Sequence, residues 1–390
     1  MAWMFRGRRH VVGSASVSRW LALWLAVALV STVAADDSVF PEARHGQGEL
    51  RYVNGLPVAI LAGTPEEIGE QHAALLAKPG APLLRFPKEF VTQGGYDAFW
   101  PLIVQASRTL LLQTPARYQR EMAAAAKQAD FDADSVGVAN TLLELRRLGC
   151  STLIIQPERS ATGGPLFGRN FDFPTLGLLD KYGLVMIYRP TGWHAFAAVG
   201  FPGMFGVFSG MNDVGLAVAT LDVYEAADGS PRFESTGVPL AFVFRQILEQ
   251  CATVDDAEKL LRNTQATTRM NLAVCDRRGG VVFEITPKSV ARREAQDSIL
   301  PCTNHFRTAG LAVDRSCWRY DRLQQATELA RLDVDDVKHY LHRANQGELT
   351  LQTMVFEPRG LVLHLALGRP PTSALPLRRL ELKPLLLGER

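Results

Sequence analysis

Three common functional signatures are missing from this sequence of 390 residues. No two cysteines form a CxxC pair, so the spacing does not support a structural zinc site. No basic tract is present, and 42 Lys and Arg residues nearly balance 40 Asp and Glu residues, which disfavours binding to nucleic acid. No glycine-rich loop joins a strand-like to a helix-like segment, so a dinucleotide-binding domain has no support. We therefore expect no metal, no cofactor and no nucleic-acid partner.

Acidic residues are missing from positions 1–35, which contain four arginines and then the apolar run WLALWLAVALVSTVAA. A basic start, an apolar middle and a small-residue end are typical of a signal peptide, so we predict cleavage after Ala35. The mature protein is then exported to the periplasm, the cell exterior or a lumen. The alternative is an uncleaved N-terminal membrane anchor, but the apolar run from Trp20 to Val30 is short for a bilayer span.

The cysteines are five in number, so at least one thiol stays unpaired within the chain. Cys251 and Cys275 lie in apolar segments and are expected in the core. Cys302 and Cys317 are close in sequence, and an exported protein could join them in a disulfide. Cys150 stands between Gly149 and Ser151, where a helix-like segment stops and a strand-like segment starts.

Helix-like and strand-like segments alternate in blocks along the chain. Thr64, Pro65 and Glu67 match a helix start with a capping box, after an exposed lead-in over 36–50. Two or three helices are expected over 98–148, and short strands separated by turns follow from Cys150. The later expectations are helices at 238–251 and 254–263, strands at 270–276 and 280–287, a solvated loop at 291–298, a helix pair over 315–345 and a final hairpin at 351–368. This order predicts an α+β fold with layers rather than a doubly wound parallel sheet.

Cys150 is the strongest candidate nucleophile, because a thiol is highly nucleophilic once deprotonated. A papain-like enzyme would need a histidine base, and the best candidate is His305 in CTNHF. A second solution is a cut before Cys150, which frees an α-amino group with a pKa of about 7.7–8.0 on the nucleophile itself. Gly149 suits this cut, since it has no side chain to hinder attack of the thiol on its carbonyl.

The segments around Cys150 resemble the Cys-type N-terminal nucleophile hydrolases. The likeness is to the penicillin acyltransferase-like group and its relatives among choloylglycine hydrolases and acid-ceramidase-like amidases. It rests on GCSTLIIQ, on the Arg-Asn-x-Asp motif in PLFGRNFDF, and on the later segments SGMNDVGLAVATLDV, TTRMNLAVCD and SCWRYDRL. GTPEEIGEQHAALL is similar to the precursor helix of the acyltransferase-like branch. The resemblance covers about residues 50–390.

This resemblance implies a fold and a division of the chain. The fold is a four-layer αββα sandwich with a helical precursor segment. The precursor spans residues 36–149 after the signal at 1–35, and the catalytic segment spans 150–390. The two segments are expected to pack as one domain, with the cut between Gly149 and Cys150.

The resemblance also implies roles for individual residues. Arg169 lowers the pKa of the Cys150 thiol, and Asp172 accepts hydrogen bonds from the new α-amine. Asn271 donates its side-chain amide to the oxyanion, while Arg319 orients Asp172 or the region of the nucleophile. One observation counts against the first pair: residues at i and i+3 of a strand point to opposite faces unless a bulge intervenes.

The substrate pocket is less well defined by the sequence. Asp222 stands where relatives contribute an Asn or Tyr, which leaves the second oxyanion donor open. Phe205 and Phe208 in FPGMFGVF are candidate walls of an apolar acyl pocket, although core positions explain them as well.

The sequence thus predicts an exported hydrolase of linear amide bonds, with a thioester acyl-enzyme on Cys150. The expected substrate is a small N-acyl amide with an apolar acyl group. Two alternatives remain open: an amine acyltransferase of the same fold, and a non-catalytic exported binding module.

Overall fold

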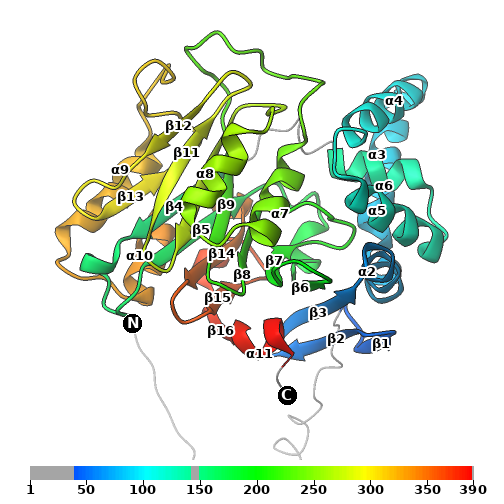
Figure 1. The fold of residues 1–390 in the computed structure, drawn as a ribbon, viewed down its shortest axis with the longest axis horizontal. Coiled ribbons are helices and arrows are strands. Elements are labelled where there is room, and N and C mark those ends of the chain that lie inside the picture. The colour runs from blue at the N-terminus through cyan, green and yellow to red at the C-terminus, as the bar shows by residue number, and fades with distance from the viewer. Residues whose placement is uncertain (1–38, 142–148, 389–390) are drawn as a thin grey trace, which may run out of the picture. The chain divides into compact units, whose positions relative to one another are not determined.

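The computed structural model describes residues 39–141 and 149–388, and Phe40–Arg390 form one compact unit (Figure 1). The predicted signal peptide at 1–35 lies outside the described residues. Two β-sheets, one of ten strands and one of six, form the centre of the unit. The fold is therefore α+β, as predicted.

The larger sheet has the strand order β1-β2-β3-β6-β7-β8-β9-β10-β11-β12. Its strands are β1 (Ala43–His45), β2 (Gly48–Val53), β3 (Leu56–Gly63), β6 (Leu184–Pro190), β7 (Phe196–Gly200), β8 (Ser209–Asn212), β9 (Ala217–Asp222), β10 (Met270–Asp276), β11 (Gly279–Ile285) and β12 (Val290–Arg293). All neighbours pair antiparallel except β3 and β6, which run parallel.

The smaller sheet has the order β13-β4-β5-β14-β15-β16, and all its pairs are antiparallel. Its strands are β4 (Gly149–Ile155), β5 (Leu166–Asp172), β13 (Ile299–Cys302), β14 (Thr350–Glu357), β15 (Val362–Ala366) and β16 (Arg378–Glu381). The expected final hairpin is β14–β15.

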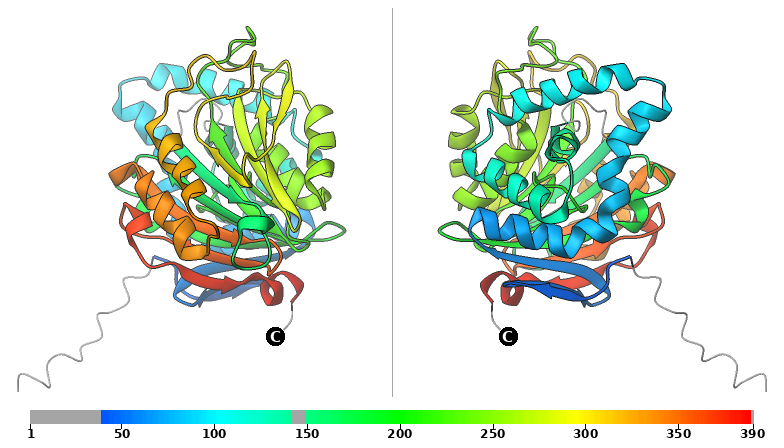
Figure 2. Two further views of the ribbon diagram at one scale, coloured as in Figure 1. Left: turned by 90° about the vertical axis from the view of Figure 1, so that its left-hand side faces the viewer. Right: turned by 90° about the vertical axis from the view of Figure 1, so that its right-hand side faces the viewer.

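Helices cover the outer face of each sheet. α9 (Trp318–Gln324) and α10 (Val334–Arg343) pack on the smaller sheet, whereas α7 (Leu240–Gln250) and α8 (Val254–Arg262) pack on the larger one. The inner faces meet where β4 contacts β9 and β11. Figure 2 shows the two helix pairs on opposite sides of the stacked sheets. This arrangement is the predicted αββα sandwich.

Between residues 39 and 141, the described part of the chain before Gly149 has a helical group of five α-helices: α2 (Pro65–His72), α3 (Lys78–Gln93), α4 (Trp100–Leu111), α5 (Ala116–Ala129) and α6 (Ala133–Thr141). The predicted capping box at the start of α2 is confirmed, because the Thr64 hydroxyl accepts the N–H of Glu67 and Glu67 accepts the N–H of Thr64. The helices expected over 98–148 are α4, α5 and α6. α3 was not expected because Pro82 and Pro87 lie inside it.

Two expected loops contain strands instead. The lead-in over 36–50 is exposed from Pro41 to Gln47 as expected, but β1 and β2 form a hairpin through Gly46 within it and join β3 at the edge of the sheet. The solvated loop at 291–298 begins with the end of β12, which pairs with β11. β1 and β12 are the two edge strands of the larger sheet, and their side chains are exposed or half-buried. Their sequences therefore have the polarity of loops.

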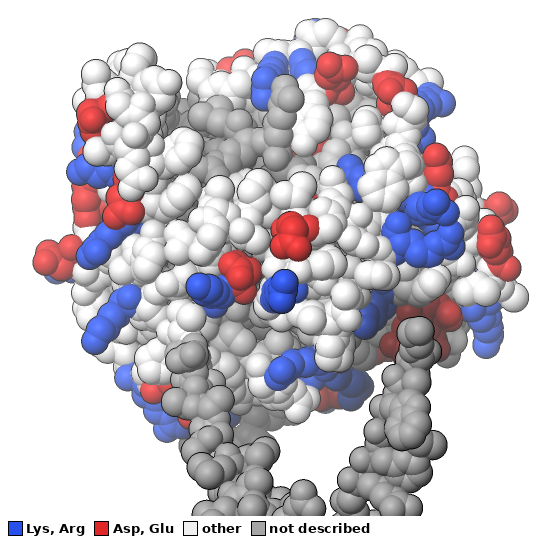
Figure 3. Space-filling view, turned by 180° about the vertical axis from the view of Figure 1, so that it is seen from behind, with Lys and Arg blue, Asp and Glu red and all other residues white. Residues whose placement is uncertain are grey.

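The described surface carries charges of both signs. Acidic and basic residues are interspersed among uncharged ones on the face shown in Figure 3. Several large exposed apolar side chains belong to α3, α4 and the turn between them, including Phe90, Phe99 and Leu102. Within the described ranges, no helix combines the length and apolar character needed to cross a membrane.

A buried charge cluster joins α5 to α7. Arg245 donates from Nη1 and Nη2 to Glu121 at 2.9 and 2.6 Å, and from Nε to Glu249 at 2.9 Å. Glu249 also accepts from the Tyr118 hydroxyl at 2.7 Å and from Arg117 at 2.8 Å. The side chains of Arg245, Glu121 and Glu249 are at most 2% exposed. The cluster therefore fixes a helix that precedes Gly149 against one that follows it.

His72 is a neutral histidine buried beside this cluster. Its Nε2 accepts the N–H of Gly203 at 2.9 Å, and its ring stacks on Phe205 with the centroids 4.5 Å apart. Burial, with a contribution from the charge of Arg245, lowers the pKa of His72 to about 3. The folded chain therefore holds His72 unprotonated at pH values where the unfolded chain binds a proton.

Replacing His72 by glutamine should make the stability less sensitive to acid. Between pH 6.5 and 3 the unfolded state binds the extra proton, so the free energy of unfolding falls as pH falls. At pH 5 the loss from this one group is about 2 kcal/mol. Urea unfolding of a cleavage-blocked chain at pH 7.5 and at pH 5 measures the fall in the free energy of unfolding between the two pH values. This fall should be about 2 kcal/mol smaller in His72→Gln. An equal loss in both chains would refute this assignment.

Candidate active site

Cys150 lies at the start of β4, in the middle of the sandwich. It pairs with Phe171 of β5 and its side chain is fully buried. All five cysteines are free thiols, so the possible bridge between Cys302 and Cys317 is absent. Among the described residues, no group of three His, Cys, Asp or Glu side chains is arranged to hold a metal ion.

Arg169 contacts the thiol of Cys150 directly. Its Nη2 donates to Sγ of Cys150 at 3.4 Å, and its Nη1 donates to the carbonyl of Thr220 on β9. The guanidinium also lies 5.3 Å from the ring centroid of Phe171. Burial raises the pKa of the Cys150 thiol, while the positive charge of Arg169 lowers it in part. The arginine thus stabilises whatever thiolate forms in this dry environment.

Asp172 lies on the other face of β5, as strand alternation requires. The bulge in this region is on β14, between Thr350 and Gln352, and not between Arg169 and Asp172. Asp172 accepts from the Thr350 hydroxyl at 2.6 Å and from Gln346 Nε2 at 2.8 Å. Burial raises the pKa of its carboxyl, and these two hydrogen bonds oppose the increase.

Arg319 connects Asp172 to the backbone of Cys150. Its Nη1 lies 3.7 Å from Asp172 Oδ2 and donates to the carbonyl of Cys150 at 2.6 Å. Its Nη2 donates to Oδ1 of Asn304 at 2.9 Å. Arg169 and Asp172 therefore approach Cys150 from opposite faces of β5, one at the thiol and one through Arg319.

Asn304 is a site residue that the sequence analysis missed. Its Oδ1 accepts the backbone N–H of Cys150 at 2.9 Å, and its Nδ2 donates to the carbonyl of Asp222 at 2.7 Å. The signal was present in CTNHF, but that segment was considered only for His305. The expected pocket residue Asp222 thus contributes a backbone carbonyl that orients Asn304.

Asn271 lies on β10, with its side chain directed at the loop that follows β13. Both of its amide hydrogens are engaged, because Nδ2 donates to the carbonyls of Thr303 at 2.9 Å and His305 at 3.1 Å. These contacts hold the loop on which Asn304 lies. They fit a positioning residue better than the oxyanion donor that the resemblance implied.

Gly149 is required by the close approach of β4 to its neighbours. A Cβ atom at this position would lie 2.4 Å from Nε2 of Gln346 and 3.1 Å from Cβ of Asp172. A larger residue would therefore displace the carboxylate that anchors Arg319.

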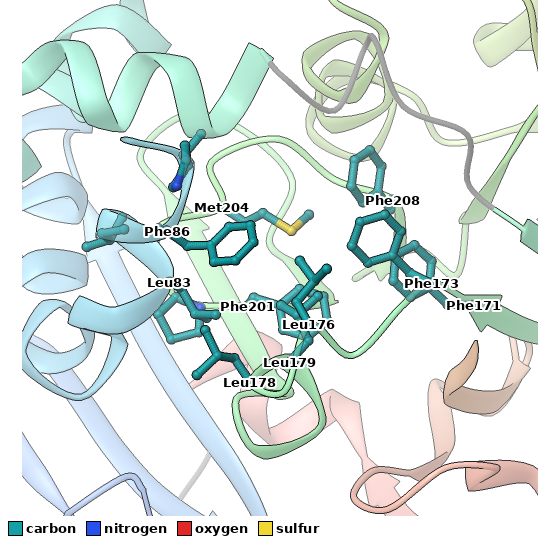
Figure 4. Close-up of a pocket in the computed structure, with 15 residues that line it drawn as sticks. Leu83, Phe86, Phe171, Phe173, Leu176, Leu178, Leu179, Phe201, Met204 and Phe208 are labelled. Carbon is teal, nitrogen blue, oxygen red and sulfur yellow. The ribbon is translucent and has the colours of Figure 1, made fainter. Parts of the chain in front are cut away.

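An apolar pocket of about 110 Å³ begins at Phe171, the cross-strand partner of Cys150. Figure 4 shows Phe171, Phe173 and Phe208 gathered on one side of it. α3 supplies other walls, including Leu83. Phe208 therefore lines the pocket as expected.

Phe205 does not line this pocket. It is buried in the core of the helical group, where it packs with Tyr118 and stacks on His72. The loop before β8 thus carries both rings and directs them into different parts of the molecule.

The family profile of the acyl-coenzyme A:6-aminopenicillanic acid acyl-transferases matches residues 159–372. The chain belongs to this family. Amide hydrolysis or acyl transfer is therefore its class of chemistry, and small N-acyl amides are the class of substrate. The match to the acyl-transferase family includes Arg169, Asp172, Asn304 and Arg319 but begins after Cys150.

Several solved structures resemble this acyl-transferase family member at low sequence identity. The Caenorhabditis elegans N-acylethanolamine-hydrolyzing acid amidase ortholog is 17% identical, with 54% of this chain and 93% of that chain covered and a TM-score of 0.43. The mutant conjugated bile acid hydrolase of Clostridium perfringens is 13% identical, with 60% of this chain and 92% of that chain covered and a TM-score of 0.40. The penicillin V acylase of Agrobacterium tumefaciens is 11% identical, with 55% of this chain and 82% of that chain covered and a TM-score of 0.35. No curated protein sequence matches the chain.

Proposed function

We propose that this chain is an exported hydrolase of linear amide bonds, which cuts itself between Gly149 and Cys150 and then uses Cys150 as nucleophile. The observation that carries the proposal is the set of contacts on Cys150. Arg169 contacts its thiol, Asn304 its N–H and Arg319 its carbonyl. Export is proposed from the signal-like composition of residues 1–35.

In the maturation step, the Cys150 thiol attacks the carbonyl carbon of Gly149. A C–S bond forms as the C–N bond breaks, and the leaving nitrogen takes the thiol proton. Water then hydrolyses the thioester, which leaves a carboxylate on Gly149, a free thiol and a new α-amine. Asn304 Oδ1 already accepts a hydrogen bond from this nitrogen in the uncut chain, so it can hold the amine afterwards.

In the catalytic cycle, the α-amine accepts the thiol proton and the thiolate attacks the substrate carbonyl. The leaving amine takes that proton as the acyl group passes to sulfur. Water then releases the acid and restores the thiol. Arg169 stabilises the thiolate, while Asp172 and Arg319 fix the backbone of Cys150.

The apolar pocket fits the acyl half of the substrate. Its walls are aliphatic and aromatic, and Phe171 connects it to the position of the thiol. α3 supplies Leu83, Leu84 and Phe86 from the segment before the cut. Both segments would therefore be needed for acyl binding.

Acyl transfer is the second candidate, because the family profile is named for an acyl-transferase. The two reactions share the thioester and differ in whether water or an amine takes the acyl group. The ratio of acid to new amide, measured with an added amine, decides between them.

A series of N-acyl amides of increasing acyl length tests the substrate class. Each methylene that enters the pocket should raise kcat/KM by up to about fourfold, which corresponds to about 0.8 kcal/mol. Leu83→Asp, which places a charge on the pocket wall, should remove most of this gain. Leu102→Asp is the matched control, because Leu102 is 60% exposed on α4 and does not line the pocket. A flat series, or equal effects of the two variants, would contradict an acyl pocket here.

Asn304→Leu should slow self-cleavage by about 10²–10³-fold, because it removes the hydrogen bonds of this side chain to the Cys150 N–H, to Arg319 and to the Asp222 carbonyl. Asn304→Asp keeps the acceptor for the Cys150 N–H and should retain more of the rate. Fragment appearance followed by mass spectrometry gives both rates, and circular dichroism checks the fold. Cleavage of Asn304→Leu at the wild-type rate would exclude a role for Asn304.

A further inference from the structure

A cavity of about 350 Å³ is formed by the end of β12, by β13, by the loop after β13 and by α9. It shares no residue with the apolar pocket. Its lining is cationic and rich in hydrogen-bond donors, which come from Arg293, Arg307, Thr308, Arg315, Tyr320 and Gln324. The cavity therefore has a chemistry of its own, suited to an anion rather than to an acyl chain.

The guanidinium of Arg307 is stacked on an aromatic ring but lacks hydrogen bonds. It lies 3.6 Å from the centroid of the Tyr320 ring. Its Nε and Nη2 are buried and donate to no acceptor among the described residues. Buried N–H groups without an acceptor are unfavourable, and a guanidinium is well shaped to bind the oxygens of phosphate and carboxylate groups. Arg307 thus holds donors that the folded chain leaves unused.

The other charges at the cavity are already matched in pairs. Arg293 donates from Nε to Glu284 at 3.2 Å. Glu294, the acidic residue in the cavity lining, accepts from Nε of Arg292 at 2.6 Å. Within the described part of the chain, the two remaining arginines of the lining form no ion pair. The cavity therefore has two positive charges that no carboxylate of the described chain balances.

Further donors at the cavity are also unengaged. In the ranges that the structure describes, the side chains of Thr308, Arg315, Tyr320 and Gln324 make no hydrogen bond. Hydroxyl, amide and guanidinium groups are the side-chain donors that proteins use to contact phosphate oxygens. The cavity thus offers several such groups at once.

Glu284 fixes the loop that carries Arg307 and Thr308. Its fully buried carboxylate accepts the backbone N–H of Arg307 at 2.8 Å and that of Thr308 at 2.9 Å. The same carboxylate holds Arg293 of β12. The backbone of the loop is therefore fixed against the larger sheet before a ligand arrives, which lowers the entropic cost of binding.

We propose that this cavity binds a small dianion of the phosphate class, either inorganic phosphate or a phosphate monoester. The two unmatched arginine charges equal the charge that a phosphate group approaches near neutral pH. Rotation of the Arg307 guanidinium on the Tyr320 ring would turn its unused N–H groups toward the anion. Binding would tie the loop that carries Asn304 to the helix that carries Arg319, and these two residues hold Cys150. The binding itself does not depend on the proposed amide chemistry.

Isothermal titration calorimetry of the full-length chain carrying Cys150→Ala tests the site, with inorganic phosphate and phenyl phosphate as probes at pH 7.5 and constant ionic strength. One site per chain should bind phosphate at least about tenfold more tightly than the monoanion acetate. Tighter binding of phenyl phosphate would identify the ligand as a monoester, and tighter binding of inorganic phosphate would identify it as the free ion. No binding of either probe, or equal affinity for acetate, overturns the proposal.

Arg307→Gln and Arg315→Gln should each weaken phosphate binding by at least about tenfold, because each removes a charge-assisted contact to the anion. The Arg315 side chain makes no contact that the fold needs, so its variant tests the site even if loss of the Tyr320 stack destabilises Arg307→Gln. Arg322→Gln is the matched control, because Arg322 is exposed on α9 and does not line the cavity. Unchanged affinity in the Arg315 variant, or an equal loss in the control, overturns the proposal.

Discussion

Replacing Cys150 by alanine should leave the chain uncut and lower amide hydrolysis by at least about 10³-fold. The variant removes the thiol that Arg169 contacts at 3.4 Å, and no thioester can form. Mass spectrometry of the purified chain and a hydrolysis assay measure the two effects. Cys275→Ala is the matched control, because Cys275 is an equally buried thiol on β10.

The control variant should be cut and active. If Cys150→Ala hydrolysed amides at the wild-type rate, the nucleophile would lie elsewhere. If both variants lost activity together, the loss would reflect folding rather than chemistry.

Replacing Arg245 by methionine should lower the free energy of unfolding by about 3–5 kcal/mol. The change leaves the buried carboxylates of Glu121 and Glu249 without their main partner, and such uncompensated charges are costly. Urea unfolding of the uncut Cys150→Ala chain provides the measurement, because both segments then unfold as one polypeptide. Arg117→Met is the control, since Arg117 is 19% exposed and forms an ion pair with only one of the two carboxylates, that of Glu249.

The control should cost less than half as much, because solvent reaches Arg117. In the processed protein, Arg245→Met should also let the two fragments separate at lower urea concentration than in the wild type. Equal stability of the Arg245→Met and unmodified chains would show that the cluster does not hold α5 against α7.

The sequence predicted the layers of the fold but not every strand. Turn residues and alternation marked the strands from β4 to β9 well. β13 is four residues long and contains Pro301, so no pattern marked it. β13 leads directly into the loop with Asn304, and this loop could not be placed without it. The resemblance assigned the oxyanion role to Asn271, and CTNHF was considered only for its histidine.

Sequence patterns also could not show how the segment before Gly149 packs against the rest of the chain. β3 pairs in parallel with β6 across more than a hundred residues of intervening chain, from Val58↔Val185 to Gly63↔Pro190. Arg245 and Glu121 look like solvent-facing charges on amphipathic helices, and only tertiary packing buries them together. The wall that α3 adds to the acyl pocket depends on the same packing.

Self-cleavage before Cys150 is tested by the intact masses of the purified full-length chain. We predict two polypeptides, the first ending at Gly149 and the second beginning with a free α-amine on Cys150. The two should co-purify, because the charge cluster and the β3–β6 pairing join them. A single uncut chain, or a cut at another peptide bond, would contradict the account.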